Sequence, residues 1–394
     1  METIHANPIH EFILHPVTPL SGFSLASQAS HDYFGAMHAP AQIKENFFQL
    51  TFEEFQSWMH LRQQKHSAAS QLFKDYYKHA LQTPRWQRVS ASARLLLEQA
   101  FSFYLPEPAH VHQAVDNTVK FVFSLEDGQC VEGVLIPFRK KYTLCISSQV
   151  GCAMGCRFCH TGTQGLLRHL RAAEIVGQYV RAKQWLKQHR PKDARIVNVV
   201  FMGQGEPLHN FDEVKRACHI LLAHRGASLA EYKITVSTCG YMPGLLRWHK
   251  EMPPVNIALS LHAPDDVRRT QLIPLNRRYP LAEVLQQLDA IPMGKKRYVT
   301  FEYLLIADFN DSDEDALSVG ELLKHRPTIL NIIPFNPYPN AIYNRPTPER
   351  VHRFTSLVSN FGFPVTVRSA KGTDILAACG QLKSSVCAAQ SVNR

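Results

Sequence analysis

The chain has 394 residues, of which 45% are hydrophobic and 19% charged. This length predicts two or three domains, or one large α/β unit with an appendage. The composition excludes an intrinsically disordered chain, and the lack of a run of about 18 apolar residues excludes a membrane-spanning helix. The first residues carry neither the basic nor the apolar region of a secretory signal, so we expect a cytoplasmic protein with no membrane partner.

The formal net charge of +10 is spread unevenly along the chain. Residues 1–60 contain one Lys and six acidic residues, which leaves an excess of +15 on the remainder. A basic body favours a polyanionic partner such as RNA or DNA. Charge alone does not decide this, because many proteins of similar charge bind neither.

Residues 1–105 are predicted to form an irregular lead-in over 1–40 and then a small helical domain. Apolar residues at helical spacing predict a helix from Thr51, and amphipathic stretches predict helices over about 67–81 and 91–103. The later part mixes basic and aromatic residues, which is typical of a nucleic-acid-binding surface. The same mixture occurs where a solvent-exposed basic face covers the edge of a hydrophobic core. These residues are Lys74, Lys78, Arg85, Arg88 and Arg94, beside Tyr76, Tyr77 and Trp86.

After residue 105 the spacing of hydrophobic residues changes from the helical period to one typical of β-strands. Residues 106–137 contain a predicted β-hairpin, with strands over 118–125 and 131–136 joined by an Asp127–Gly128 turn. Over 138–374, β-type runs alternate with helices, and six such βα units predict a partial parallel (β/α)6 barrel. The strands are predicted at 142–147, 196–202, 232–238, 255–261, 298–306, 329–334 and 364–368, and the helices at 172–188, 211–223, 281–290, 313–324 and 348–360. In such folds, the loops at the carboxyl ends of the strands carry the chemistry.

Three of the nine cysteines, Cys152, Cys156 and Cys159, form a C-x3-C-x2-C triplet after the first predicted barrel strand. Thiolates at this spacing can hold three corners of a four-iron cubane, which leaves one iron open to a substrate or cofactor. A zinc site completed by His160 and a redox triplet are the alternatives. Zinc normally needs a second pair of Cys or His ligands, and none is evident. The isolated cysteines are expected to be small buried apolar side chains, namely Cys130, Cys218 and Cys239.

The triplet, with an aromatic residue before its last cysteine, resembles the signature of the radical S-adenosylmethionine (SAM) superfamily. Longer blocks narrow the resemblance to the 23S rRNA adenine-C2 methyltransferases (RlmN) and their adenine-C8 relatives (Cfr). These blocks are TLCISSQVGC at 143–152, FCHTGTQGL at 158–166, GQGEP at 203–207, SLHAP at 260–264, IPFNP at 333–337 and AACGQL at 377–382. They occur in order, and with Glu132 they span about two thirds of the chain.

The resemblance implies a radical mechanism that uses a 4Fe-4S cluster and SAM. A radical route fits an adenine C2 carbon, which is electron-poor and does not take a methyl cation by displacement. By resemblance, Cys379 first carries the methyl group, Glu132 removes the C2 proton, and Cys145 releases the product by forming a disulfide with Cys379. Cys379 lies in a tail over 375–394 that contains glycine and can fold over the barrel mouth.

The SAM contacts implied by the resemblance all follow predicted strands, as the barrel rule requires. They are Gly205, Glu206, Ser237, Ser260, Leu261, His262 and Asn336. The implied partners are RNA, namely 23S rRNA with tRNA as a second candidate, and an electron donor such as flavodoxin or ferredoxin. We expect a monomer. Basic clusters expected to position phosphates are Arg139–Lys141, Arg268–Arg269, Arg277–Arg278 and Lys295–Arg297.

Two other functions stay open at this point: adenine-C8 methylation, and a non-catalytic RNA-binding or assembly factor that retains the fold. The sequence also departs from the family pattern. Gln204 stands where Met is usual and His160 where Ser or Ala is commoner, and residues 1–105 resemble the family only loosely. These departures leave the cluster motif intact and put the identity of the RNA substrate in question.

Overall fold

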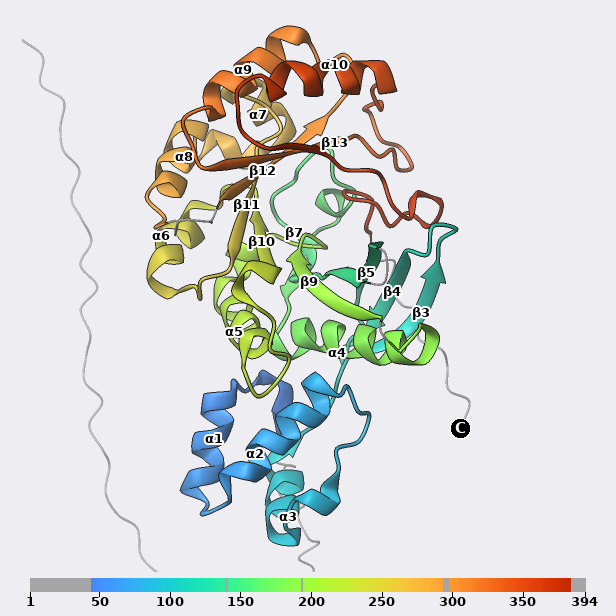
Figure 1. Ribbon diagram of the computed structural model, residues 1–394, viewed down its shortest axis with the longest axis vertical. Helices are drawn as coiled ribbons and strands as arrows, with labels where there is room; N and C mark the ends of the chain where they lie inside the picture. The colour runs from blue at the N-terminus through green and yellow to red at the C-terminus, as the bar shows by residue number, and fades with distance from the viewer. Residues whose placement is uncertain (1–43, 139–140, 193, 293–297, 384–394) are drawn as a thin grey trace, which may run out of the picture. The chain divides into compact units, whose positions relative to one another are not determined.

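The computed structural model describes residues 44–138, 141–192, 194–292 and 298–383 (Figure 1). The predicted lead-in, the end of the tail, the cluster at 295–297 and most of the cluster at 139–141 lie outside these residues. Within them, no helix combines the length and the apolar character needed to cross a membrane.

The described part of the N-terminal segment is helical. It contains α1 (Phe52–Leu61), α2 (His66–Phe73), the π-helical turn η2 (Lys74–Lys78) and α3 (Ala91–Ala100), and two short parallel strands, β1 (Glu45–Asn46) and β2 (Phe101–Ser102). α1 begins at a capping box, in which the Thr51 hydroxyl accepts from the Glu54 N–H and the Glu54 carboxylate accepts from the Thr51 N–H. Aromatic rings fill the core between these helices, as in the contact of Phe47 with Phe55.

Of the two interpretations of the basic and aromatic mixture in this segment, the structure favours a core edge for two of the three aromatic residues. Tyr76 and Tyr77 are buried and pack edge-on against Phe48, with ring centroids 5.0 and 5.9 Å away. Asp75 beside them is also buried, and Arg85 forms an ion pair with it. The rings gain more from burial in the core than from exposure, so they are not free to stack on bases.

A ten-stranded mixed sheet forms the body of the protein, in the order β14-β13-β12-β11-β10-β9-β6-β5-β4-β3. Its parallel strands are β6 (Lys141–Cys145), β9 (Arg195–Phe201), β10 (Ile234–Thr238), β11 (Asn256–Ser260), β12 (Val299–Leu305), β13 (Thr328–Pro334) and β14 (Val365–Val367). Antiparallel β5 (Cys130–Phe138), β4 (Val119–Ser124) and β3 (Glu107–Gln113) extend one edge. The predicted α/β class, hairpin and partial barrel are confirmed; β3 was not predicted.

Helices follow the parallel strands and cover the outer face of the sheet (Figure 1). The predicted ones are α4 (Ala172–His189), α5 (Phe211–Leu222), α8 (Leu281–Asp289), α9 (Asp313–Leu323) and α10 (Pro348–Ser359), while α6 (Met242–Glu251) and α7 (Asp266–Leu272) were missed. Between β6 and α4 lies an unpredicted hairpin of β7 (Gln149–Cys152) and β8 (Gly165–His169). Because the seven strands run parallel, their carboxyl ends meet along one edge, and the loops that carry the candidate residues gather there.

Candidate active site

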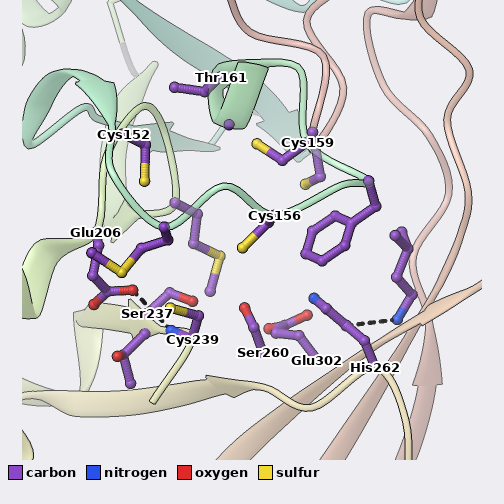
Figure 2. A pocket seen from close by; sticks show the side chains of 18 of the residues that line it. Cys152, Cys156, Cys159, Thr161, Glu206, Ser237, Cys239, Ser260, His262 and Glu302 are labelled. Carbon is purple, nitrogen blue, oxygen red and sulfur yellow. Dashed lines mark hydrogen bonds between the residues drawn. The ribbon is translucent and has the colours of Figure 1, made fainter. Parts of the chain in front are cut away.

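Three thiols from one loop face a common cavity (Figure 2). Cys152 ends β7, and Cys156 and Cys159 follow in the loop that leads to the short helix η4 (Thr161–Thr163). Two glycines give this loop its tight course: Gly155 has a φ of +65°, and a Cβ at Gly162 would lie 2.6 Å from the carbonyl oxygen of Cys156. Three thiols on a curled loop, open to one cavity, fit the three protein ligands of a 4Fe-4S cluster.

His160 is turned away from these thiols. Its ring stacks on Tyr338, with centroids 4.7 Å apart, and its Nδ1 lies 3.3 Å from the carbonyl oxygen of Gln381. Within the described residues, no three His, Cys, Asp or Glu side chains converge on a point that could hold one metal ion. His160 therefore serves to dock the tail, and the zinc alternative loses its fourth ligand.

Glu206 is fixed at the carboxyl end of the neighbouring strand by backbone donors. Its Oε1 accepts from the Leu208 N–H at 3.0 Å, and its Oε2 accepts from the Cys239 N–H at 2.8 Å. Burial raises the pKa of this carboxyl against the lowering effect of these hydrogen bonds. Gly205 before it has a φ of +101°, and a Cβ there would lie 2.6 Å from the Gln149 Cβ, so only glycine lets the chain pass.

His262 follows β11 in a left-handed conformation, with a φ of +61°. Its Nδ1 accepts from the Leu304 N–H at 3.0 Å, so its Nε2 carries the proton. Burial lowers the pKa of the ring to about 3, and the charge on Arg269 contributes. Phe158 packs edge-on against the ring at 4.5 Å. The structure thus holds a neutral imidazole, in strained backbone, at the cavity wall.

The other implied SAM contacts fall into two groups. Ser237 and Ser260 line the cavity with Gly205, Glu206 and His262. Leu261 is fully buried and is not part of the cavity lining, and its N–H donates to the Glu302 carbonyl at 2.9 Å. The Asn336 Nδ2 donates to the Cys379 carbonyl at 3.4 Å, so this side chain contacts the tail and is not part of the cavity lining.

The described part of the tail packs directly on the cysteine loop. The His160 N–H donates to the Gly380 carbonyl at 2.8 Å, and the Thr161 hydroxyl donates to the Leu382 carbonyl at 2.6 Å. Gln381 closes the turn: its Oε1 accepts from the Ala378 N–H, and its Nε2 donates to the Pro337 carbonyl. This clamp holds Cys379 at the cavity, as its position in a foldable tail predicted.

Cys145 and Glu132 lie behind the tail, outside the cavity lining. Cys145 ends β6 and packs with Ala377 and Leu382 of the tail. Its pKa is raised to about 12, first by burial and then by the nearby Cys379. Glu132 on β5 is 3.3 Å from the Lys120 Nζ, and its Oε2 accepts from the Lys383 N–H at 2.9 Å. Burial raises the pKa of Glu132, while Lys120 lowers it.

The predicted disulfide between Cys145 and Cys379 is absent: both are free cysteines. The two thiols are neighbours but differ in their surroundings, because Cys145 is enclosed in an apolar cluster while Cys379 opens into the cavity. The fold is therefore formed without a disulfide between Cys145 and Cys379.

Two departures from the expected pattern have local explanations. Gln204 is fully buried, and its Oε1 accepts from the Glu132 N–H at 2.9 Å, so it helps hold that strand. The Arg268–Arg269 pair is engaged by other groups of the protein. Arg269 is fully buried and donates to backbone carbonyls, and the partly exposed Arg268 pairs with Asp265 and Asp315.

Sequence reasoning missed three cavity residues, Cys239, Glu302 and Arg368. Cys239 was predicted only to be buried, yet its thiol reaches Cys156. Glu302 is a charged residue inside the apolar run of β12, which is itself a signal of function in a buried parallel strand. Arg368 follows β14, so the rule of carboxyl strand ends would have found it.

Comparison with known proteins agrees with this geometry. A model of the radical SAM superfamily matches residues 146–319. The dual-specificity RNA methyltransferase RlmN of Pelobacter propionicus is 40% identical over 348 residues, which cover 88% of this chain and 98% of the relative. The chain belongs to the RlmN family of radical SAM methyltransferases. The RlmN protein of Pseudomonas fluorescens is 39% identical, covering 87% of this chain and 91% of its own.

The fold of the family is also represented among solved structures. A radical SAM methyltransferase from Sphaerobacter thermophilus superposes with a TM-score of 0.80 at 36% identity, covering 86% of this chain and all of that one. Membership of the RlmN family implies the use of SAM and of a 4Fe-4S cluster.

Proposed function

We propose that this methyltransferase acts on C2 of an adenine in 23S rRNA, and also on tRNA, through a methyl group carried by Cys379. The observation that supports this most directly is the unequal placement of two cysteines. Cys379 opens into the cavity that the cluster loop lines, while Cys145 is enclosed behind it with Glu132 nearby on the adjacent strand. The RlmN relatives are named as dual-specificity RNA methyltransferases, which supports two classes of RNA.

The cavity divides into a cluster side and a SAM side. Cys152, Cys156 and Cys159 would hold the 4Fe-4S cluster, which, once reduced by a flavodoxin or ferredoxin, would supply the electron for radical chemistry on SAM. On the other side, the Glu206 carboxylate would accept from the methionyl amine. The pKa of the His262 ring is lowered to about 3, so the ring is neutral near pH 7. Its Nε2–H is then a hydrogen-bond donor toward the cavity.

Glu132 is suited to remove the C2 proton. Its burial raises the pKa above the ordinary value of 4.5, which makes the carboxylate a stronger base. In the structure, the Glu132 Oε2 accepts a hydrogen bond from the Lys383 N–H. For the target adenine to reach Glu132, the end of the tail must therefore release this hydrogen bond.

RNA would meet a basic rim beside the cluster loop. Arg277 and Arg278 are exposed on and after the turn η7 (Pro274–Arg277), next to α7. The Arg157 N–H of the cluster loop donates to the Leu272 carbonyl of α7, which ties this rim to the cavity mouth. An enzyme with these RNA substrates, acting as a monomer, would work in the cytoplasm.

Mass mapping of modified adenines tests the proposal. Ribosomal and transfer RNA from cells with and without the gene should differ by a methyl group on adenine, and fragmentation should assign it to C2. A methyl group at C8 would establish the alternative chemistry of the family. If the two cell lines show no difference and the purified holoenzyme does not cleave SAM, a non-catalytic RNA-binding factor becomes the better account.

A further inference from the structure

Arg368 places a positive charge beside the sulfur of Cys379 in the cavity. It follows β14, and its backbone N–H donates to the Ile332 carbonyl at 2.8 Å. Among the described lining residues it is the only Lys or Arg. Its Nη1 lies 4.0 Å from the Cys379 Sγ and 3.8 Å from the Met202 Sδ.

The guanidinium group is not fully neutralised by protein carboxylates. Its Nη2 lies 3.6 Å from Glu302 Oε1, an ion pair without a hydrogen bond. Glu302 Oε1 instead accepts from Asn331 Nδ2 at 3.0 Å, and Oε2 has no hydrogen-bond partner among the described residues. Burial also raises the pKa of Glu302, which weakens it as a counter-charge. A partly buried cation favours a second anion close by, and the Cys379 sulfur is the group in reach.

We propose that Arg368 is the catalytic counter-ion that keeps Cys379 as a thiolate for its own methylation. This rests on the proposed function, in which Cys379 carries the methyl group. The thiol proton leaves to solvent, and the thiolate electron pair attacks the methyl carbon of SAM. The new S–CH3 bond forms as the methyl–sulfonium bond breaks, S-adenosylhomocysteine departs, and Cys379 becomes a neutral thioether. No electron is gained or lost overall.

The same contact explains why Cys379 and not Cys145 receives the methyl group. The guanidinium lies 4.0 Å from the Cys379 sulfur, while Cys145 is enclosed by apolar side chains. The Arg368 charge also reaches Cys145, where it is the weakest of the named influences on the pKa of that thiol. Burial and the charge of a neighbouring Cys379 raise the pKa of Cys145 to about 12. One cation can support one thiolate at a time, so ionisation of Cys379 keeps Cys145 protonated until the methyl group has neutralised its neighbour.

Thiol reactivity tests the contact without any need for turnover. The full chain is produced without iron, and peptide mass spectrometry first selects preparations in which Cys379 carries no methyl group. Alkylation of Cys379 by iodoacetamide at neutral pH is then followed by the same method. We expect Arg368→Met to slow alkylation of Cys379 about tenfold, because the thiolate is the reactive form and this change removes the cation 4.0 Å from its sulfur. Arg368→Lys should retain most of the rate, and Glu302→Gln should raise it by removing the competing carboxylate.

Arg345→Met is the matched control, because this guanidinium contacts Asn336 near the tail and does not contact the Cys379 sulfur. Equal slowing in both Met variants would mean general loosening of the tail and would overturn the inference. So would an unchanged rate in Arg368→Met, or a slower rate in Glu302→Gln.

Methyl occupancy of Cys379 in holoenzyme purified from cells provides the second readout. Arg368→Met should lower the occupancy several-fold, and Arg368→Lys should restore it. Wild-type enzyme that never carries a methyl group on Cys379 would refute the proposed function while leaving the alkylation result standing. Full methylation of Arg368→Met would refute only the role of Arg368.

Discussion

At the scale of single residues, exposure separates the roles of two cysteines. Cys379 is half-buried at the cavity, whereas Cys145 is 7% exposed and packs under the tail. A side chain that must receive a methyl group needs access to SAM. A thiol that acts only after the base has been attacked is better protected from earlier methylation by its enclosure.

Replacing each cysteine should therefore stop the reaction at a different step. Cys379→Ala should never form a protein–RNA bond, because no methyl carrier is present. Cys145→Ala should carry a methylated Cys379, attack the base and retain covalently bound RNA, which denaturing gels with and without ribonuclease detect. Normal turnover of Cys145→Ala without bound RNA would contradict the methyl-carrier mechanism.

The pH dependence of product release should reflect Glu132. A base is active in its ionised form, and burial raises the pKa of Glu132 above 4.5. Release should therefore be lost as the pH falls through a value higher than that of an ordinary glutamate. Removing the Lys120 charge, which lowers this pKa, should move the loss to still higher pH.

Single-turnover formation of methylated RNA by the holoenzyme, measured across pH for wild type and Lys120→Met, checks this. Lys78→Met, at an exposed site away from Glu132, is the control and should leave the profile unchanged. A profile that Lys120→Met does not shift would separate Glu132 from the proton transfer.

At the scale of elements, the tail is held by few but well-placed hydrogen bonds. Gln381 bridges the Ala378 N–H and the Pro337 carbonyl, and its loss would leave the buried Ala378 N–H unpaired. Such a loss costs about 1–3 kcal/mol. Gln381→Ala should thus leave the global unfolding temperature nearly unchanged and speed hydrogen exchange over 376–382 by about tenfold to a hundredfold.

Gln286→Ala, in α8 away from the tail, is the matched control for that exchange experiment. Slow exchange over 376–382 in Gln381→Ala would show that the apolar contacts of Ala377 and Leu382 suffice to dock the tail.

Elements with a strong apolar pattern could be predicted, and those without one could not. The parallel strands are buried runs bounded by polar loops, so each predicted strand overlaps an observed one within a few residues. β3 reads EPAHVHQ and is almost wholly exposed, so no alternation marks it. α7 is only seven residues long and mostly polar. The hairpin of β7 and β8 is held by backbone pairing, which composition does not reveal.

In the site, too, residues marked by sequence motifs could be predicted, whereas residues placed by tertiary packing could not. Cluster, SAM-side and tail residues were predicted because motifs and strand ends mark them. The buried Tyr76 and inward-facing Arg269 were misread, because their sequence neighbourhoods resemble a basic surface and only tertiary packing turns them inside. Arg368 was missed because its partners, Cys379 and Glu302, are distant in the sequence.

At the scale of the whole molecule, the net charge of +10 should make RNA affinity steeply salt-dependent. Since Arg268 and Arg269 are engaged internally, the exposed Arg277 and Arg278 are the described members of the predicted clusters best placed for phosphates. Replacing both by Ala should weaken binding of an rRNA fragment and reduce the slope of log affinity against log salt by about two.

Fluorescence anisotropy over a salt series measures that slope. Arg326→Ala, which removes one positive charge from a surface ion pair with Asp289, serves as the control and should leave the slope unchanged. An unaltered slope in the double variant would place the RNA on another face.

The docking of the tail on the cysteine loop also has a consequence for biosynthesis. His160 and its partner Gln381 are 221 residues apart in the chain. At about 5–20 residues per second, a ribosome needs roughly ten to forty seconds to translate that distance. During this interval the nascent loop already displays its thiols while the segment that will cover them does not yet exist. Iron–sulfur assembly factors thus have a timed opportunity to load the protein before its own carboxyl-terminal segment closes over the loading site.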